Sequence, residues 1–255
     1  MEEAEDRAAW LEDREDGRSL TLPELARGGQ VVFTLTGRTD SILVKAGAAE
    51  LRSGLKGGER SVTVPLREHG RAILPGSSVK GAVRARVEAI AELMGLGEAV
   101  TEALFGRESR RSPDGENQDN GLAGKARFED AVLSGRSREI SRIRINKFTG
   151  GVIRQGLFTE EPLESDVTLR VTLPAAEAVG CGLLLYALRD LGLGLYNLGS
   201  GGAIGRGYLT VDTIRVQVPG GIEAWLRFDR DRHCTVEDPT GLFDGWLNGI
   251  RRDEA

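Results

Sequence analysis

Five glycines lie in the segment LGSGGAIGRGYL (198–209), and glycine-rich loops often bind phosphate because a bare backbone can approach it closely. A dinucleotide-binding fingerprint needs a strand before the glycines and a helix after them. Here the order is reversed, since the expected helix ends near Gly192 and the expected strand begins near Arg206. No Lys-Ser or Lys-Thr follows the glycines, as a P-loop requires. The segment is therefore either a tightly packed turn or a loop that approaches another surface.

A second candidate phosphate site is the segment ILPGSSVKGAVRARVE (73–88). Ser77 and Ser78 lie at the start of an expected helix, where unpaired N–H groups and the helix dipole favour an anion. Lys80 and Arg84 are four residues apart and share one helix face. The alternative is an ordinary capped helix with solvated bases. Its expected apolar stripe lies on a different face and comprises Val79, Val83, Val87, Ile90 and Met94.

The charge distribution is more informative than the net charge of −5. Residues 1–29 carry nine acidic and four basic side chains and so account for the whole excess. Residues 71–86 hold four basic side chains and no acid, and residues 134–157 hold six against Glu139 alone. Two such patches on a neutral body favour a polyanionic partner, and two solvated protein faces are the alternative.

The order of the expected elements indicates an α+β protein. Two βαβ units follow one another, which predicts a ferredoxin-like split βαβ core with long insertions. A pair of strand-like stretches around TGG predicts a protruding hairpin over about 138–158. The expected strands are 30–37, 123–133, 165–173 and 206–218, the expected helices are about 79–94 and 175–192, and residues 38–67 are expected to form a loop and a short strand.

The domain boundaries follow from composition. Residues 1–29 are an acidic N-terminal extension, residues 30–218 form the main domain, and residues 219–255 are a tail that packs on the core. Residues 106–122 are almost wholly polar and predict a loop. The acidic N-terminus is unlike a signal peptide and no apolar run is long enough to span a bilayer, so we expect a cytoplasmic protein without a membrane partner.

Two of the segments described above together resemble a known protein family. LPGSSVKGAVR, followed about 120 residues later by GSGGAIGRGYL, resembles the RAMP superfamily of CRISPR-associated proteins. The stretch RINKFTGGVIRQGLF is similar to part of the backbone subunits of type III CRISPR effector complexes, and the whole resemblance covers residues 30–218. It implies an RRM-like, ferredoxin-like core whose copies, or related neighbours, line up along a guide RNA (crRNA) together with other type III subunits.

The resemblance also implies roles for particular residues. The segment with Ser77, Ser78, Lys80 and Arg84 would contact the guide backbone, and the glycine-rich loop would lie close to the same RNA. The hairpin would act as a thumb that kinks guide and target RNA. The candidate RNA-binding residues of the thumb are Arg142, Arg144, Lys147, Phe148 and Arg154, and those of the loop are Gly201, Gly202, Gly205 and Arg206.

Catalysis is less well defined by the sequence. The resemblance implies target-RNA cleavage by an aspartate before the PGSS segment, with Mg²⁺ or Mn²⁺ held partly by substrate phosphate. Residues 61–64, where that aspartate is expected, contain none. Asp40 is therefore the candidate catalytic residue, with Glu59 second, and no tightly bound cofactor is expected.

Two other functions stay open. A RAMP endoribonuclease that processes guide-RNA precursors needs a general base, for which His69 and His233 give little support, and neither suggests zinc. A non-catalytic module whose basic hairpin binds a partner protein is the second alternative. Cys181 and Cys234 are far apart and have no CxxC partner, so we expect reduced thiols.

Overall fold

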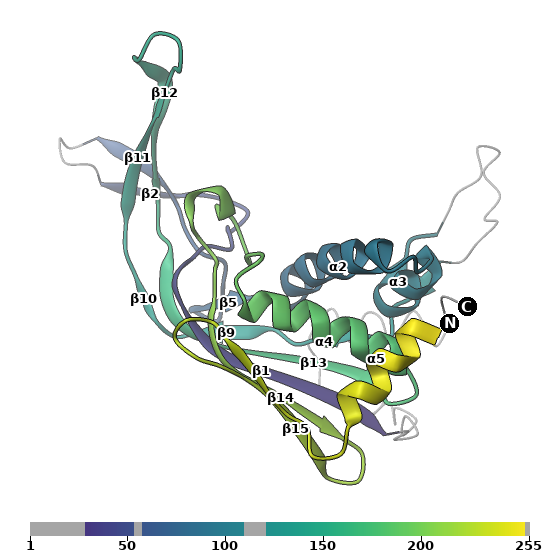
Figure 1. The fold of residues 1–255 in the computed structure, drawn as a ribbon. Coiled ribbons are helices and arrows are strands. Elements are labelled where there is room, and N and C mark those ends of the chain that lie inside the picture. Colours follow the sequence, from purple (N-terminus) through teal and green to yellow (C-terminus); the bar gives the residue numbers. More distant parts are fainter. Residues whose placement is uncertain (1–28, 54–57, 110–120, 253–255) are drawn as a thin grey trace, which may run out of the picture.

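The computed structural model describes residues 29–53, 58–109 and 121–252. The predicted acidic extension lies outside these ranges except for Gly29, and so do residues 110–120 of the predicted polar loop. The described residues form four β-sheets and four α-helices (Figure 1). The α+β class predicted from the sequence is confirmed.

The largest sheet has seven strands in the order β10-β13-β1-β14-β15-β16, with β8 also paired to β13. Strand β1 is central, and it pairs antiparallel with β13 on one side and β14 on the other. Residues 219–237 of the predicted tail extend this sheet instead of merely covering it. The strands are β1 (Gln30–Ile42), β8 (Arg127–Phe128), β10 (Arg136–Ser137), β13 (Leu163–Pro174), β14 (Thr210–Val218), β15 (Ile222–Phe228) and β16 (Cys234–Glu237).

Alternation of apolar and polar residues gives the sheet one buried face. On β13, Val167, Leu169 and Val171 are buried while the residues between them are exposed, as the two-residue period of a strand requires. On β1, Phe33 pairs with Val171 and Leu35 with Leu169, so the apolar sides of the two strands coincide. The helices α2 (Gly76–Leu93), α4 (Ala178–Gly192) and α5 (Leu242–Arg252) lie on one side of this sheet (Figure 1).

Helical periodicity explains how these helices pack. On α2 the buried Val79, Val83 and Val87 recur every four residues, as predicted from the sequence. On α5, Phe243, Trp246 and Ile250 belong to the hydrophobic core, and the Trp246 ring lies 6.0 Å from that of Phe33. The end of the chain thus contributes to the core. No helix in the described ranges is long and apolar enough to cross a membrane.

A second sheet of four strands, in the order β11-β12-β3-β2, carries the hairpin. Strands β11 (Ile140–Ile145) and β12 (Val152–Glu160) project from the rest of the molecule, and only the base of β12 pairs with β3, in parallel (Figure 1). The hairpin predicted at about 138–158 is present. The prediction of a loop and one short strand over 38–67 was wrong, because β1 runs on to Ile42 and the segment also forms β2 (Glu50–Ser53) and β3 (Glu59–Thr63).

In the middle of the chain, two smaller sheets differ from the elements that the sequence predicted. The strand predicted over 123–133 is broken into the end of β7 (Leu122–Ala123), then β8, then β9 (Ala131–Leu133). At the first of these breaks Gly124 packs closely on Phe105, so that a Cβ would lie 2.4 Å from the Phe105 carbonyl carbon. Strand β7 pairs with β6 (Gly106–Arg107), which follows α3 (Glu98–Phe105), so the ends of the predicted loop 106–122 are strands. The third sheet has the order β4-β5-β9, with β4 (Arg67–Glu68) and β5 (Arg71–Leu74).

Candidate nucleic-acid interface

The hairpin of β11, β12 and the turn 146–151 between them is called the thumb below. Its turn is held by Asn146, whose side-chain oxygen accepts hydrogen bonds from the backbone N–H groups of Phe148 (2.8 Å) and Thr149 (3.3 Å). Gly150 adopts φ +68° in this turn, a conformation that suits glycine. The turn presents Lys147 and Phe148 at the tip, with the Phe148 side chain 86% exposed.

The two faces of the thumb differ in chemistry. Ile143 and Ile145 of β11 pair with Leu157 and Val152 of β12, and all four side chains are exposed. Arg142 and Arg144 alternate with the isoleucines and therefore lie on the opposite face. There the Arg144 guanidinium lies 5.8 Å from the centre of the Phe158 ring. On β11, therefore, the isoleucines and the arginines lie on opposite faces of the thumb.

In the part of the chain that the structure describes, the basic side chains of the thumb and of the segment leading into it lack acidic partners. Within the described ranges, none of the six makes an ion pair with a carboxylate, although Lys147 and Arg144 contact aromatic rings. Their charges are therefore available to an external anion. The six residues are Arg136, Arg138, Arg142, Arg144, Lys147 and Arg154.

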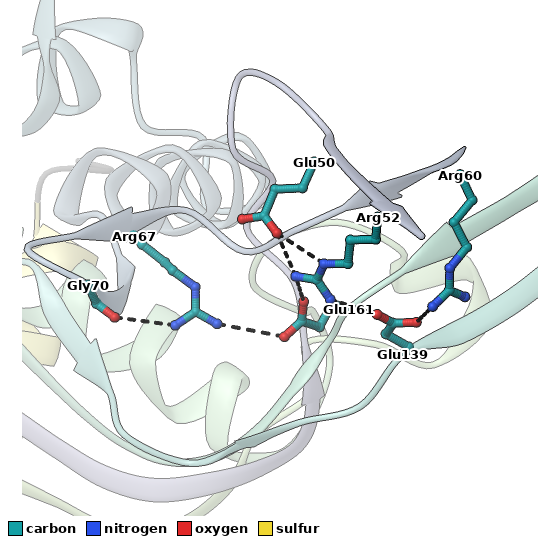
Figure 2. Close-up of polar contacts among 7 residues, drawn as sticks. All are labelled: Glu50, Arg52, Arg60, Arg67, Gly70, Glu139 and Glu161. Carbon is teal, nitrogen blue, oxygen red and sulfur yellow. Dashed lines mark hydrogen bonds and ion pairs between the residues drawn. The ribbon is translucent and has the colours of Figure 1, made fainter. Parts of the chain in front are cut away.

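A network of ion pairs joins the base of the thumb to β2 and β3. Figure 2 shows Arg52 of β2 between three carboxylates: it contacts Glu50 at 2.6 Å, Glu139 at 2.7 Å and Glu161 at 2.7 Å. Arg60 of β3 also contacts Glu139, at 2.5 Å. Glu139 precedes β11 and Glu161 follows β12, so Arg52 of β2 ties both ends of the thumb to one strand.

The network shifts the pKa values of its members. Hydrogen bonds to Glu50, Glu139 and Glu161, in that order of size, raise the pKa of Arg52. Burial alone would raise the pKa of the Glu161 carboxyl, but hydrogen bonds from Ser137 and Arg52, with the nearby positive charges, outweigh it and lower that pKa. Glu161 is thus a buried carboxylate held ionised by its neighbours.

The N-terminus of α2 already holds an anion from the protein. Pro75 is the N-cap, and the backbone N–H of Gly76 donates to the Asp130 carboxylate at 2.6 Å. Ser77 is exposed and Ser78 half-buried, and neither hydroxyl caps the helix. The two serines therefore lie in the first turn beside the Asp130 carboxylate.

The two basic residues predicted on α2 have different surroundings. Arg84 contacts Glu88 at 2.7 Å and donates to the carbonyl oxygen of Gly106 at 3.2 Å. Lys80 is half-buried and has no acidic partner in the described part of the chain. Lys80 is therefore the more available cation of the pair.

The glycine-rich loop, residues 198–209, is fixed at its base and exposed at its tip. The N–H of Gly207 donates to the carbonyl of Ser41 at 2.6 Å, and the N–H of Ser200 donates to that of Leu43 at 2.9 Å. A Cβ at Gly207 would lie 1.8 Å from the carbonyl oxygen of Leu198, so only glycine fits there. Ala203, Ile204 and Gly205 at the tip are exposed, and Gly202 is half-buried. The left-handed conformations that shape the loop occur at Gly199, Gly201, Gly205 and Gly207.

Arg206 does not lie where a surface cation would. Its side chain is 2% exposed, and its Nη1 donates to the Glu160 carboxylate at 2.7 Å. Glu160 is the last residue of β12, and its side chain is only 8% exposed. In this conformation Arg206 links the loop to the thumb from inside the protein and is not open to solvent.

Asp40 is exposed near the end of β1 and lines a hollow of about 330 Å³. Glu164 and Asp166 line the same hollow, together with Arg38 and Arg136. Carboxylate oxygens suit Mg²⁺ or Mn²⁺. However, Asp40 is not part of a tight group of three ligand-type side chains in the described residues. The group that is present comprises Asp229, Asp231 and His233, in the exposed turn between β15 and β16.

The model of the RAMP superfamily matches residues 34–210. This match covers more than half of the chain and includes both the α2 segment and the glycine-rich loop. The chain belongs to the RAMP superfamily. Membership indicates a CRISPR-associated, RNA-binding role. No curated protein sequence matches the chain.

Several residues at the candidate site of this RAMP protein could not be predicted from the sequence. Glu160 and Glu161 end the thumb as two acidic residues that look solvated in the sequence, yet both are buried against arginines. Asp130 lies 54 residues from the helix that it caps. No local pattern marks such pairs, because the partners are distant in the chain.

Proposed function

We propose that the protein is a guide-RNA-binding backbone subunit of a type III CRISPR ribonucleoprotein. The observation that carries this proposal is the thumb, a projecting hairpin whose basic side chains lack carboxylate partners within the described residues. Desolvated or paired charges contribute little to polyanion binding, whereas free Lys and Arg side chains release counterions from a nucleic acid when they contact its phosphates.

The strand order supports a ferredoxin-like, RRM-like core. Strands β14, β1, β13 and β8 lie side by side, and each pair is antiparallel. Helix α2 precedes β8 and helix α4 lies between β13 and β14, which is the order of a split βαβ fold. The thumb and the strands β2 and β3 are then insertions into that core.

In this proposal the RNA lies at the thumb and not across the open face of the main sheet. RRM domains read bases by stacking them on aromatic residues of that face. Here Trp225 has the guanidinium groups of Arg215 and Arg227 at 5.3 and 5.0 Å from its ring centre. Arg215 and Arg227 also pair with Glu223 and Glu237, which leaves little free positive charge there.

The remaining candidate residues take supporting roles. Ser77, Ser78 and Lys80 at the start of α2 contact guide phosphates, and the exposed tip of the glycine-rich loop approaches the same strand. These contacts hold the backbone without reading sequence. Base pairing of the guide supplies specificity, and the thumb separates and kinks successive segments of guide and target.

Target cleavage belongs to the proposal as a second activity of the same subunit. Asp40 is the exposed carboxylate that would hold Mg²⁺ or Mn²⁺, together with substrate phosphate. Glu164 and Asp166 line the same hollow and offer further oxygen ligands. The metal would supply an activated water or stabilise the leaving oxygen.

The experiment is to purify the tagged protein from its native host at moderate salt and sequence any RNA that comes with it. RNA of uniform length with repeat-derived ends is the expected result. A thumb variant with Arg142, Lys147 and Arg154 replaced by alanine is the control, and it should carry less RNA. Heterogeneous cellular RNA, or equal amounts on both proteins, would contradict the proposal. Metal-independent cleavage of a repeat hairpin would favour guide processing instead.

A further inference from the structure

The glycine-rich loop and the thumb are joined by one buried ion pair. Arg206, next to the tip of the loop, and Glu160, at the base of β12, are 2.7 Å apart and almost fully buried. The pair spans 46 residues of sequence. Among the residues that the structure describes, Glu160 has one further charged neighbour, Lys45 at 3.6 Å, whose side chain is half exposed.

Arg206 depends on Glu160 for its only side-chain partner in the described part of the chain. The Nε and Nη2 atoms of Arg206 are buried and have no hydrogen-bond partner there. These two atoms form one edge of the guanidinium, so the side chain bonds through its other end alone. The loop closes over the side chain: the N–H of Arg206 donates to the carbonyl of Gly201 at 3.1 Å, and a Cβ at Gly201 would lie 3.1 Å from the Arg206 Cδ.

We infer that Arg206 and Glu160 are positioning residues that fix the glycine-rich loop relative to the thumb, so that both grip one RNA strand in register. The inference rests on the proposed function in that it takes RNA as the ligand of both elements. Arg206 itself does not contact the RNA.

The burial of the Arg206–Glu160 pair explains why we assign it a positioning role. A buried ion pair with unsatisfied N–H groups is no better for stability than apolar side chains of the same size. The pair instead fixes the relative orientation of two segments, because a guanidinium–carboxylate bond holds them at one distance and angle. The segments joined here are the two that carry candidate RNA contacts.

The first test is Glu160→Gln in the full chain, with a fluorescein-labelled single-stranded RNA as the probe. If Glu160 acted only as a charge, removing it would strengthen binding of a polyanion. Positioning predicts the opposite sign: affinity falls by about fivefold or more, the range of typical coupling between two sites. The dependence of affinity on salt stays unchanged, because no phosphate contact is removed. Tighter or unchanged binding would overturn the inference.

The matched control is Glu161→Gln, the same substitution one residue further on. Glu161 is equally buried but pairs with Arg52 and Arg67 instead of the loop. We expect this variant to loosen β2 and β4, which carry Arg52 and Arg67, while the glycine-rich loop keeps its protection. An equal loss of affinity in both variants would show a general effect on the fold and would overturn the inference.

Amide hydrogen exchange on the RNA-free protein tests the link independently of RNA. Glu160→Gln should raise exchange in residues 198–209 and at the base of β12 but not in β1, β13 or β14. Should Glu160→Gln fail to fold, the double variant Glu160→Met/Arg206→Met keeps the volume without the bond, and the same loss of affinity and protection is expected. If the native protein binds no RNA, the proposed function fails, and unchanged exchange would then reject the loop–thumb link separately.

Discussion

Removing unpaired cations from the thumb should change the salt dependence of RNA binding as well as its strength. We choose Arg142, Lys147 and Arg154, which lie on both strands and at the tip, and replace all three with alanine. None of them has a carboxylate partner in the described ranges, so their loss leaves no orphaned acid behind. The fold should therefore be unaffected.

The size of the change in salt dependence is calculated with one phosphate contact for each of the three replaced cations. Each contact to a single strand contributes about 0.7 to the slope of log affinity against log salt, so three contacts contribute about 2. Between about 50 and 200 mM salt, a fourfold change, the native protein should lose roughly 18-fold more affinity than the variant, since four to the power 2.1 is about 18.

The assay is fluorescence anisotropy of a labelled RNA over that range of salt, with thermal unfolding to verify the fold. The control variant replaces Arg170, Arg215 and Arg227 with alanine. It removes the same charge from the main sheet, but these arginines pair with Glu129, Glu223 and Glu237. Its slope should match that of the native protein. An equal flattening in both variants, or none in the thumb variant, would refute the idea that unpaired charge locates the RNA.

Other predictions concern catalysis and stability. Asp40→Asn should leave guide binding intact and abolish Mg²⁺-dependent cleavage of target RNA, and continued cleavage would move the site elsewhere. Asp130→Ala should lower the free energy of unfolding by about 1 kcal/mol in urea titrations, the usual effect of losing a helix cap; no change would show that solvent replaces the cap. The Glu161 pKa is lowered in the fold from 4.5, so its contribution to stability is present above that value and is lost as pH falls through the folded pKa. Urea titrations of Glu161→Gln below pH 4.5 should therefore show a weaker dependence of stability on pH than the native protein, and an identical dependence would contradict the assignment.

Periodic elements could be predicted from the sequence because their signal is local. The stripe of Val79, Val83 and Val87 gave α2, although the helix begins three residues earlier than expected, at Gly76. Strict alternation gave β13 to within two residues at each end. In both cases one side of the element faces a core, and burial enforces the period that the sequence displays.

Strands β2 and β3 could not be predicted in this way. Their exposed residues outnumber the buried ones, and only Val62 is buried among the nine residues. They are held by pairing with the thumb and by the ion pairs of Arg52 and Arg60. The sequence shows charged residues between glycines there, which is also the pattern of a solvated loop.

The same limit applies to the candidate interface. Counting basic residues located the thumb correctly as a basic segment, but it gave equal weight to Lys80 and Arg84, and the family resemblance added Arg206 as a further candidate. The structure separates them by their partners: Arg84 is neutralised by Glu88, Arg206 by Glu160, and Lys80 by no acid in the described residues. A cation that is already paired must break that pair before it can hold a phosphate, whereas a free one needs only to lose water and counterions. In the function proposed here, pairing, and not the number of positive charges, therefore decides which arginines can hold RNA and which position the residues that do.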